Sequence, residues 1–75
     1  MREWLKNLRQ ERGMTQQQVA EKMGLSTSYY SFIETGFRQK KMDIVVIAKL
    51  AEIFGLSIQE IADLETAYKA GIDSP

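Results

Sequence analysis

The sequence contains no cysteine and no histidine, and it has one proline among its 75 residues. Without cysteine, neither a disulfide framework nor a thiolate zinc site can form. Without histidine, the chain lacks the most common general base and a frequent metal ligand. We therefore expect a protein that is not an enzyme and that carries no metal and no cofactor.

Long apolar runs are missing as well. The longest covers residues 44–48 and is ended by Lys49, whereas a membrane span needs roughly 20 residues. Residues 1–4 are not followed by the apolar segment of a signal peptide. We expect a cytoplasmic protein with no membrane partner. At this length there is also no room for a separate domain that would bind a small-molecule effector.

The charges balance overall but are unevenly distributed along the chain. Residues 1–41 hold eight basic and four acidic side chains, and residues 42–75 hold two basic and six acidic ones. A basic half turned toward phosphate would explain this division. A chance division of solvated charges explains it equally well.

Periodic apolar residues predict an all-α protein with five helices. We expect them at about residues 2–12, 16–23, 27–34, 44–54 and from residue 58 onward. Four side chains are placed to cap helix N-termini, namely Thr15, Ser26, Asp43 and Ser57. Ile44 and Ile58 should lie on buried faces with Leu50 and Ile61. The loops are short, so residues 1–70 should form a single domain, and residues 71–75 should be a frayed C-terminus.

The second and third predicted helices are separated by only three residues, 24–26. So short a connection joins two helices at a steep angle. Ala20 is small enough to let the helices approach closely, and Gly24 can take the positive φ that such a turn requires. Tyr30 and Ile33 lie three residues apart and should face the core together.

Residues 16–33 resemble the helix-turn-helix of the lambda/434 repressor and Cro family, also called the XRE family. The matching residues are Gln16, Ala20, Gly24, Ser26, Tyr30 and Ile33. The wider frame matches over about residues 3–64, including Leu5-Lys6-x-Leu8-Arg9 and Leu50-Ala51-x-x-Phe54-Gly55. Tyr30 stands where the family usually has Ile or Val, and the loop after Gly36 is longer than is typical. The resemblance implies a five-helix lambda-repressor-like fold and a DNA-binding regulator of transcription.

The resemblance implies that the third helix, about residues 27–34, enters the major groove of double-stranded DNA. If Tyr30 and Ile33 face the core, the opposite face offers base-reading candidates, which are Thr27, Ser28, Ser31 and Phe32. Ser26 begins the same helix and joins this set. Thr27 and Ser28 could instead be simple capping residues, and Phe32 a packing residue. Tyr29 could donate a hydrogen bond to a phosphate or lean on the core.

Other residues are candidates for contact with the phosphate backbone. Gln16 opens the second helix, where amide N–H groups favour anions, and the resemblance gives it a phosphate contact. Gln17 is a weaker candidate, and the basic loop adds Arg38, Lys40 and Lys41. The alternative for these cations is an ordinary solvated loop. By resemblance, Arg9 and Glu34 form a structural ion pair and do not contact DNA.

The sequence thus predicts a sequence-specific DNA-binding regulator, which we expect to be a repressor. Trp4, Leu64 and Tyr68 could belong to the core or to a homodimer surface on the fifth helix. A homodimer would read two half-sites of an operator. The alternative function is an antitoxin-like protein-interaction module that binds DNA only secondarily.

Overall fold

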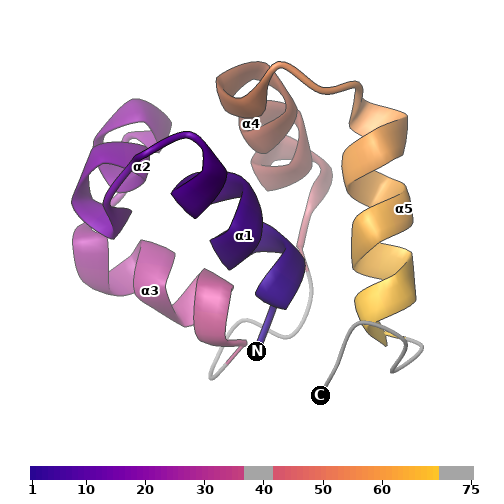
Figure 1. Ribbon diagram of the computed structural model, residues 1–75, viewed down its shortest axis with the longest axis horizontal. Helices are drawn as coiled ribbons and strands as arrows, with labels where there is room; N and C mark the ends of the chain where they lie inside the picture. Colours follow the sequence, from indigo (N-terminus) through magenta and orange to yellow (C-terminus); the bar gives the residue numbers. More distant parts are fainter. Residues whose placement is uncertain (37–41, 70–75) are drawn as a thin grey trace.

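The computed structural model describes residues 1–36 and 42–69 and contains five α-helices (Figure 1). They are α1 (Glu3–Glu11), α2 (Gln16–Met23), α3 (Thr27–Thr35), α4 (Ile44–Phe54) and α5 (Ile58–Lys69). No strand occurs in these two segments, so the all-α prediction is confirmed. None of the helices described is long and apolar enough to cross a membrane.

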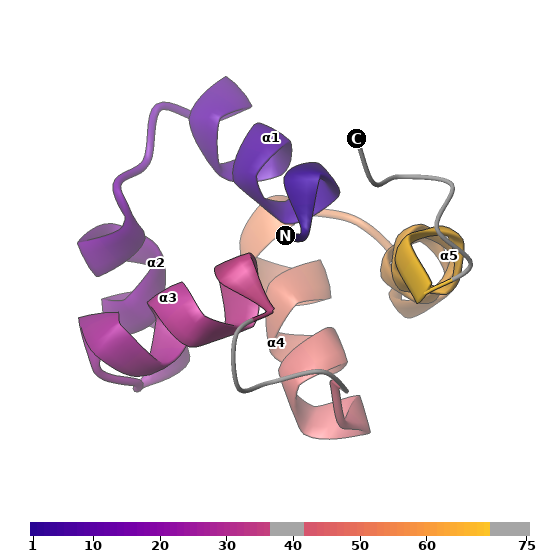
Figure 2. The same cartoon turned by 90° about the horizontal axis from the view of Figure 1, so that it is seen from below.

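Helix α4 lies between the α2–α3 pair and α5. Helix α2 packs on α3, and α5 packs mainly on α4. In two perpendicular views α5 lies on the opposite side of the molecule from α2 and α3 (Figures 1 and 2). The helix-turn-helix pair and the C-terminal helix therefore lie on opposite sides of one core.

Hydrogen bonds from the predicted caps fix the helix starts. The Thr15 and Gln18 side chains form a reciprocal capping box at α2, and Ser57 and Glu60 exchange the same bonds before α5. Ser26 Oγ accepts the Tyr29 amide at 3.1 Å. Each such cap satisfies backbone donors that the first turn of a helix leaves unpaired. Asp43 Oδ1 likewise accepts the Val46 amide at 2.9 Å before α4. The predicted starts of these four helices are thus confirmed.

The core lies where all five helices meet. Leu5, Val19, Ile33, Leu50 and Ile61 are fully buried within it. Packing of these side chains stabilises the orientation of each helix, because burial of an aliphatic side chain contributes about 1.5–3 kcal/mol.

Two predicted core residues are exposed instead. Ile44 is 64% exposed and Ile58 is 48% exposed, so their assignment to the core was wrong. Both are the first residues of their helices. Helical side chains tilt toward the N-terminus, so a side chain in the first position extends past the edge of the core.

Candidate nucleic-acid interface

The turn between α2 and α3 depends on one left-handed residue. Gly24 has φ 72° and ψ 28°, a left-handed conformation that is higher in free energy for any residue with a Cβ atom. The next amide, of Leu25, donates to the Ala20 carbonyl at 2.9 Å. This bond closes the C-terminus of α2 and directs the chain into Ser26, where α3 is capped.

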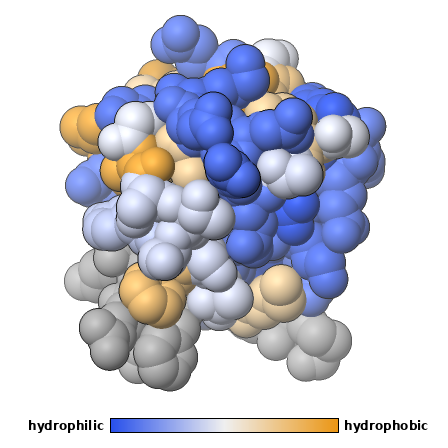
Figure 3. All heavy atoms as spheres, turned by 90° about the vertical axis from the view of Figure 1, so that its left-hand side faces the viewer, coloured by the Kyte–Doolittle hydropathy of each residue, from blue (hydrophilic) through white to orange (hydrophobic). Residues whose placement is uncertain are grey.

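Helix α3 presents a weakly polar face to solvent. Thr27, Ser28 and Tyr29 are exposed, and Ser31 and Phe32 are half-buried. Figure 3 looks onto the side of the molecule that holds α2 and α3, and a pale patch there adjoins a strongly hydrophilic area. Hydroxyl groups and two aromatic rings are therefore the chemistry that this face offers a ligand.

Two uncertain placements on this helix are now defined. Tyr29 is 42% exposed, so it lies at the surface of α3 and not within the core. Ser26 caps α3 and is also exposed. Tyr30 is fully buried, as its spacing from Ile33 predicts.

Beneath this face an ion pair joins α1 to α3. Arg9 donates to both oxygens of Glu34, from Nε and Nη2, each at 2.9 Å. The Glu34 side chain is 1% exposed. The Gln16 amide donates to the same carboxylate at 3.3 Å, so the first residue of α2 is joined to the end of α3.

Burial and mutual contacts shift the pKa values of Glu34, Arg9 and Tyr30. For Glu34, burial is the largest influence and would raise its pKa, but the hydrogen bonds that the carboxylate accepts, the strongest from Arg9, act together with the Arg9 charge to hold the pKa below its usual value. The Glu34 hydrogen bond in turn raises the pKa of Arg9. Burial, with the Glu34 charge beside it, raises the pKa of the Tyr30 phenol well above its usual range.

Comparison with known proteins places this arrangement in a family. The profile of the helix-turn-helix family matches residues 5–69, which spans both helices of the turn, most of α1 before them, and α4 and α5 after them. The chain belongs to the helix-turn-helix family. The recognition made from residues 16–33 is thereby confirmed, as is the five-helix, lambda-repressor-like fold.

Two curated proteins share this helix-turn-helix unit. One is the uncharacterized HTH-type transcriptional regulator YqaF of Bacillus subtilis (strain 168). It is 42% identical over 55 residues, which are 73% of this chain and 70% of YqaF. The HTH-type transcriptional regulator PrpR of Mycobacterium tuberculosis (strain ATCC 25618 / H37Rv) is 44% identical over 55 residues, but these are only 11% of PrpR. No solved structure matches the chain significantly.

The other predicted contact residues of this helix-turn-helix protein are differently placed. Gln17 is exposed and donates to Glu21 at 3.2 Å, one turn further along α2. Arg38, Lys40 and Lys41 lie outside the described residues.

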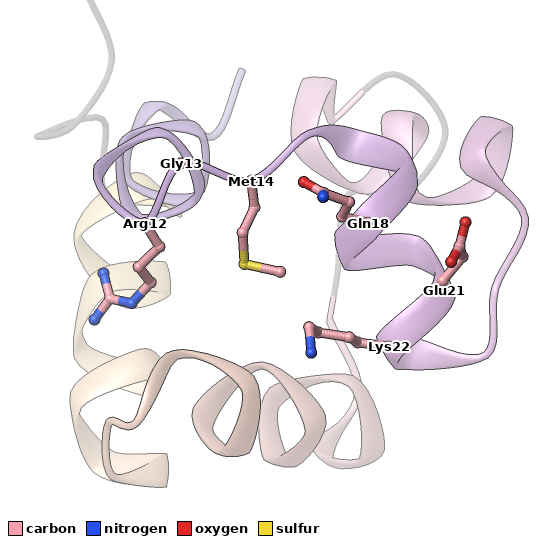
Figure 4. A pocket seen from close by; sticks show the side chains of 6 residues that line it. All are labelled: Arg12, Gly13, Met14, Gln18, Glu21 and Lys22. Atoms are coloured by element: carbon pink, nitrogen blue, oxygen red, sulfur yellow. The ribbon is translucent and has the colours of Figure 1, made fainter.

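A hollow beside the turn from α1 to α2 is a second surface with mixed charge. Its volume is about 500 Å³, and its lining includes Arg12, Met14 and Lys22. In Figure 4 the Arg12 and Lys22 side chains enter the hollow from opposite sides, with Met14 between them. The Arg12 guanidinium donates to the Phe54 carbonyl at 2.8 Å. Arg12 therefore caps the C-terminus of α4.

One buried ion pair was not predicted from the sequence. The Arg2 side chain is 0% exposed and pairs with Glu65 at 2.7 Å, although Arg2 was counted with the basic half of the chain. The helical spacing held one signal, because Glu65 follows the buried Ile61 by four residues and so shares its face. An acidic residue on an apolar face requires a cationic partner, but the sequence does not identify that partner.

Proposed function

We propose that this protein is a sequence-specific DNA-binding regulator of transcription that acts in the cytoplasm. The exposed face of α3 carries the proposal. Its capped N-terminus, its three exposed residues and the fully buried Tyr30 and Ile33 behind them give it the form of a recognition helix. YqaF and PrpR carry the name of transcriptional regulator, which supports the same function here.

In the proposed complex α3 lies in the major groove with its first turn at the base edges. Thr27 and Ser28 hydrogen-bond to base edges and discriminate weakly, since hydroxyl groups fit several bases. Phe32 makes apolar contact with a thymine methyl group. Ser31 lies on the same side, and Ser26 and Tyr29 approach the phosphates from the start of the helix.

The phosphate contacts are assigned to the residues that flank this helix. Gln16 is held by Glu34 at the N-terminus of α2, where exposed amide N–H groups attract an anion. Gln17, next to it, joins this set. Arg38, Lys40 and Lys41 add positive charge, and each phosphate that a cation neutralises steepens the dependence of affinity on salt.

We further propose that the regulator is a repressor and that it acts as a homodimer through α5. Leu56, Leu64 and Ala67 line a hollow of about 320 Å³ along this helix, and a second copy would cover it. Sedimentation equilibrium tests the assembly. Ala67→Glu should shift the protein to the monomer, whereas Thr66→Glu, on the exposed side of the same helix, should not.

The function is tested by titrating fluorescent duplex from upstream of the gene and following anisotropy, with a scrambled duplex as control. We expect the upstream duplex to bind about a thousandfold more tightly and both affinities to fall with salt. Thr27→Ala should weaken the specific complex, whereas the matched Thr66→Ala should leave it unchanged. Equal and weak binding of both duplexes would contradict the proposal and favour a protein-interaction module.

A further inference from the structure

Arg2 makes a set of buried contacts that the proposed DNA interface does not use. Its Nε and Nη2 atoms donate to the two oxygens of Glu65 at 2.8 and 2.7 Å. The Arg2 side chain is 0% exposed and that of Glu65 is 6% exposed. A guanidinium engaged in this forked geometry is held in one orientation. The pair joins the first residues of the chain to the middle of α5.

The same arginine closes the C-terminus of α3. Its Nη1 atom donates to the Ile33 carbonyl at 2.7 Å, and its backbone N–H donates to the Glu34 carbonyl at 2.8 Å. The last four carbonyls of a helix have no partner within the helix. Arg2 satisfies two of them and adds a positive charge at the negative end of the helix dipole.

A second contact runs from α5 to the same end of α3. The Arg2 guanidinium lies 5.0 Å from the centre of the Tyr68 ring. The Tyr68 hydroxyl also reaches Gly36, the C-cap of α3, so closely that a Cβ atom there would come within 2.6 Å of it. Arg2 and Tyr68 together connect the end of α3 to a helix on the far side of the molecule.

We infer that Arg2 is a positioning residue for DNA recognition, which holds the last turn of α3 against α5 without touching DNA. This inference rests on the proposed function. A recognition helix whose last turn is already ordered loses less conformational entropy on binding. Displacement of α5 would reach the end of α3 through Arg2 and through the Tyr68 contact beside it.

The test uses a double variant, Arg2→Met with Glu65→Met. Replacing both members of a buried pair by apolar residues leaves no stranded charge, so the fold is retained. The probe is the duplex that the wild-type protein selects from a random library. We expect the affinity of the double variant for this duplex to be lower by a factor of about five or more. The slope of affinity against salt should stay unchanged, because Arg2 neutralises no phosphate.

Arg12→Met is the matched control. Arg12 also donates to a helix C-terminus, at Phe54 of α4, and lies 5.3 Å from an aromatic ring. This control should lose stability but keep its affinity for the selected duplex. A general loss of stability would weaken both variants alike, whereas loss of positioning weakens only the Arg2 variant.

Amide hydrogen exchange without DNA gives a second readout. The Thr35 and Gly36 amides at the end of α3 should exchange faster in the double variant, while those of α2 should not. Arg2→Lys keeps a cation beside Glu65 but cannot make the forked contact, so it should shift both readouts in the same direction by less, and it serves if the double variant does not fold. Wild-type affinity, unchanged exchange or a reduced salt slope in a folded variant would each overturn the inference. A wild-type protein that selects no sequence would overturn the proposed function instead, and exchange alone would then decide whether Arg2 holds α3.

Discussion

Replacing Arg9 with methionine isolates the contribution of the ion pair beneath the recognition helix. The change leaves Glu34 with a side chain that is 1% exposed and without its cation. It also removes the bond from Arg9 to the Met14 carbonyl, which is 2.9 Å long. A buried charge that loses its partner costs about 3–5 kcal/mol.

This cost is comparable with the total stability of the protein. A domain of this size rarely has more than roughly 3–5 kcal/mol of stability. We therefore expect Arg9→Met to be largely unfolded at neutral pH. The double variant Arg9→Met with Glu34→Met leaves no stranded charge, so it should lose no more than about 2 kcal/mol relative to the wild type.

The penalty should depend on pH in a defined direction. In the wild type the pKa of Glu34 is lowered by folding, so the pair contributes its full stability above the usual value of 4.5. That contribution is lost as the pH falls through the lower folded value. In Arg9→Met, burial remains without the cation and raises the pKa of Glu34. Acid neutralises the stranded carboxyl group, so the penalty should begin to shrink as the pH falls through this raised pKa. It should shrink further below 4.5, where the wild type loses its own contribution.

The assay is urea unfolding followed by far-ultraviolet circular dichroism at pH 7 and pH 4, with all variants at one protein concentration. A variant that is already unfolded before urea is added is scored as having lost all of the wild-type free energy of unfolding. The reasoning would be refuted if Arg9→Met lost less than about 1 kcal/mol at pH 7, or if its penalty were the same at both pH values.

Four further substitutions follow from the structure. Gly24→Ala should lower stability by about 1 kcal/mol through its positive φ alone. Gly36→Ala should lower it more, because the added Cβ atom would also meet the Tyr68 hydroxyl at 2.6 Å. Thermal unfolding compares the two variants. Ser26→Ala should remove the α3 cap and lower stability by about 1 kcal/mol, measured by urea unfolding. Phe32→Ala should weaken the selected duplex about tenfold without changing the salt slope, measured by anisotropy. An unchanged affinity would make Phe32 a packing residue.

Local patterns predicted most of the fold because helix starts depend on neighbouring residues. Thr15 with Gln18, and Ser26 alone, fix the starts of α2 and α3 through bonds that span three residues. Periodic spacing identified the fully buried Tyr30 and Ile33. It failed at Ile44, because periodicity does not show where the core ends.

The long-range polar contacts could not be predicted in the same way. Arg2 and Glu65 are 63 positions apart, and no local pattern pairs them. Tyr29 was ambiguous, because a tyrosine on a helix next to a buried residue suits either core or surface. The Arg9–Glu34 pair was expected only because the chain resembles its family.

The central claim is that the exposed face of α3 reads DNA sequence, and a change of specificity tests it most directly. Glutamine can bond adenine through two hydrogen bonds, whereas serine cannot. Random duplexes would be selected with the wild type, with Ser28→Gln and with the control Thr66→Gln on α5. We predict that Ser28→Gln changes the preferred base at one position of the selected sequence, toward adenine, and that the control changes nothing. Identical sequences from all three proteins would contradict the claim.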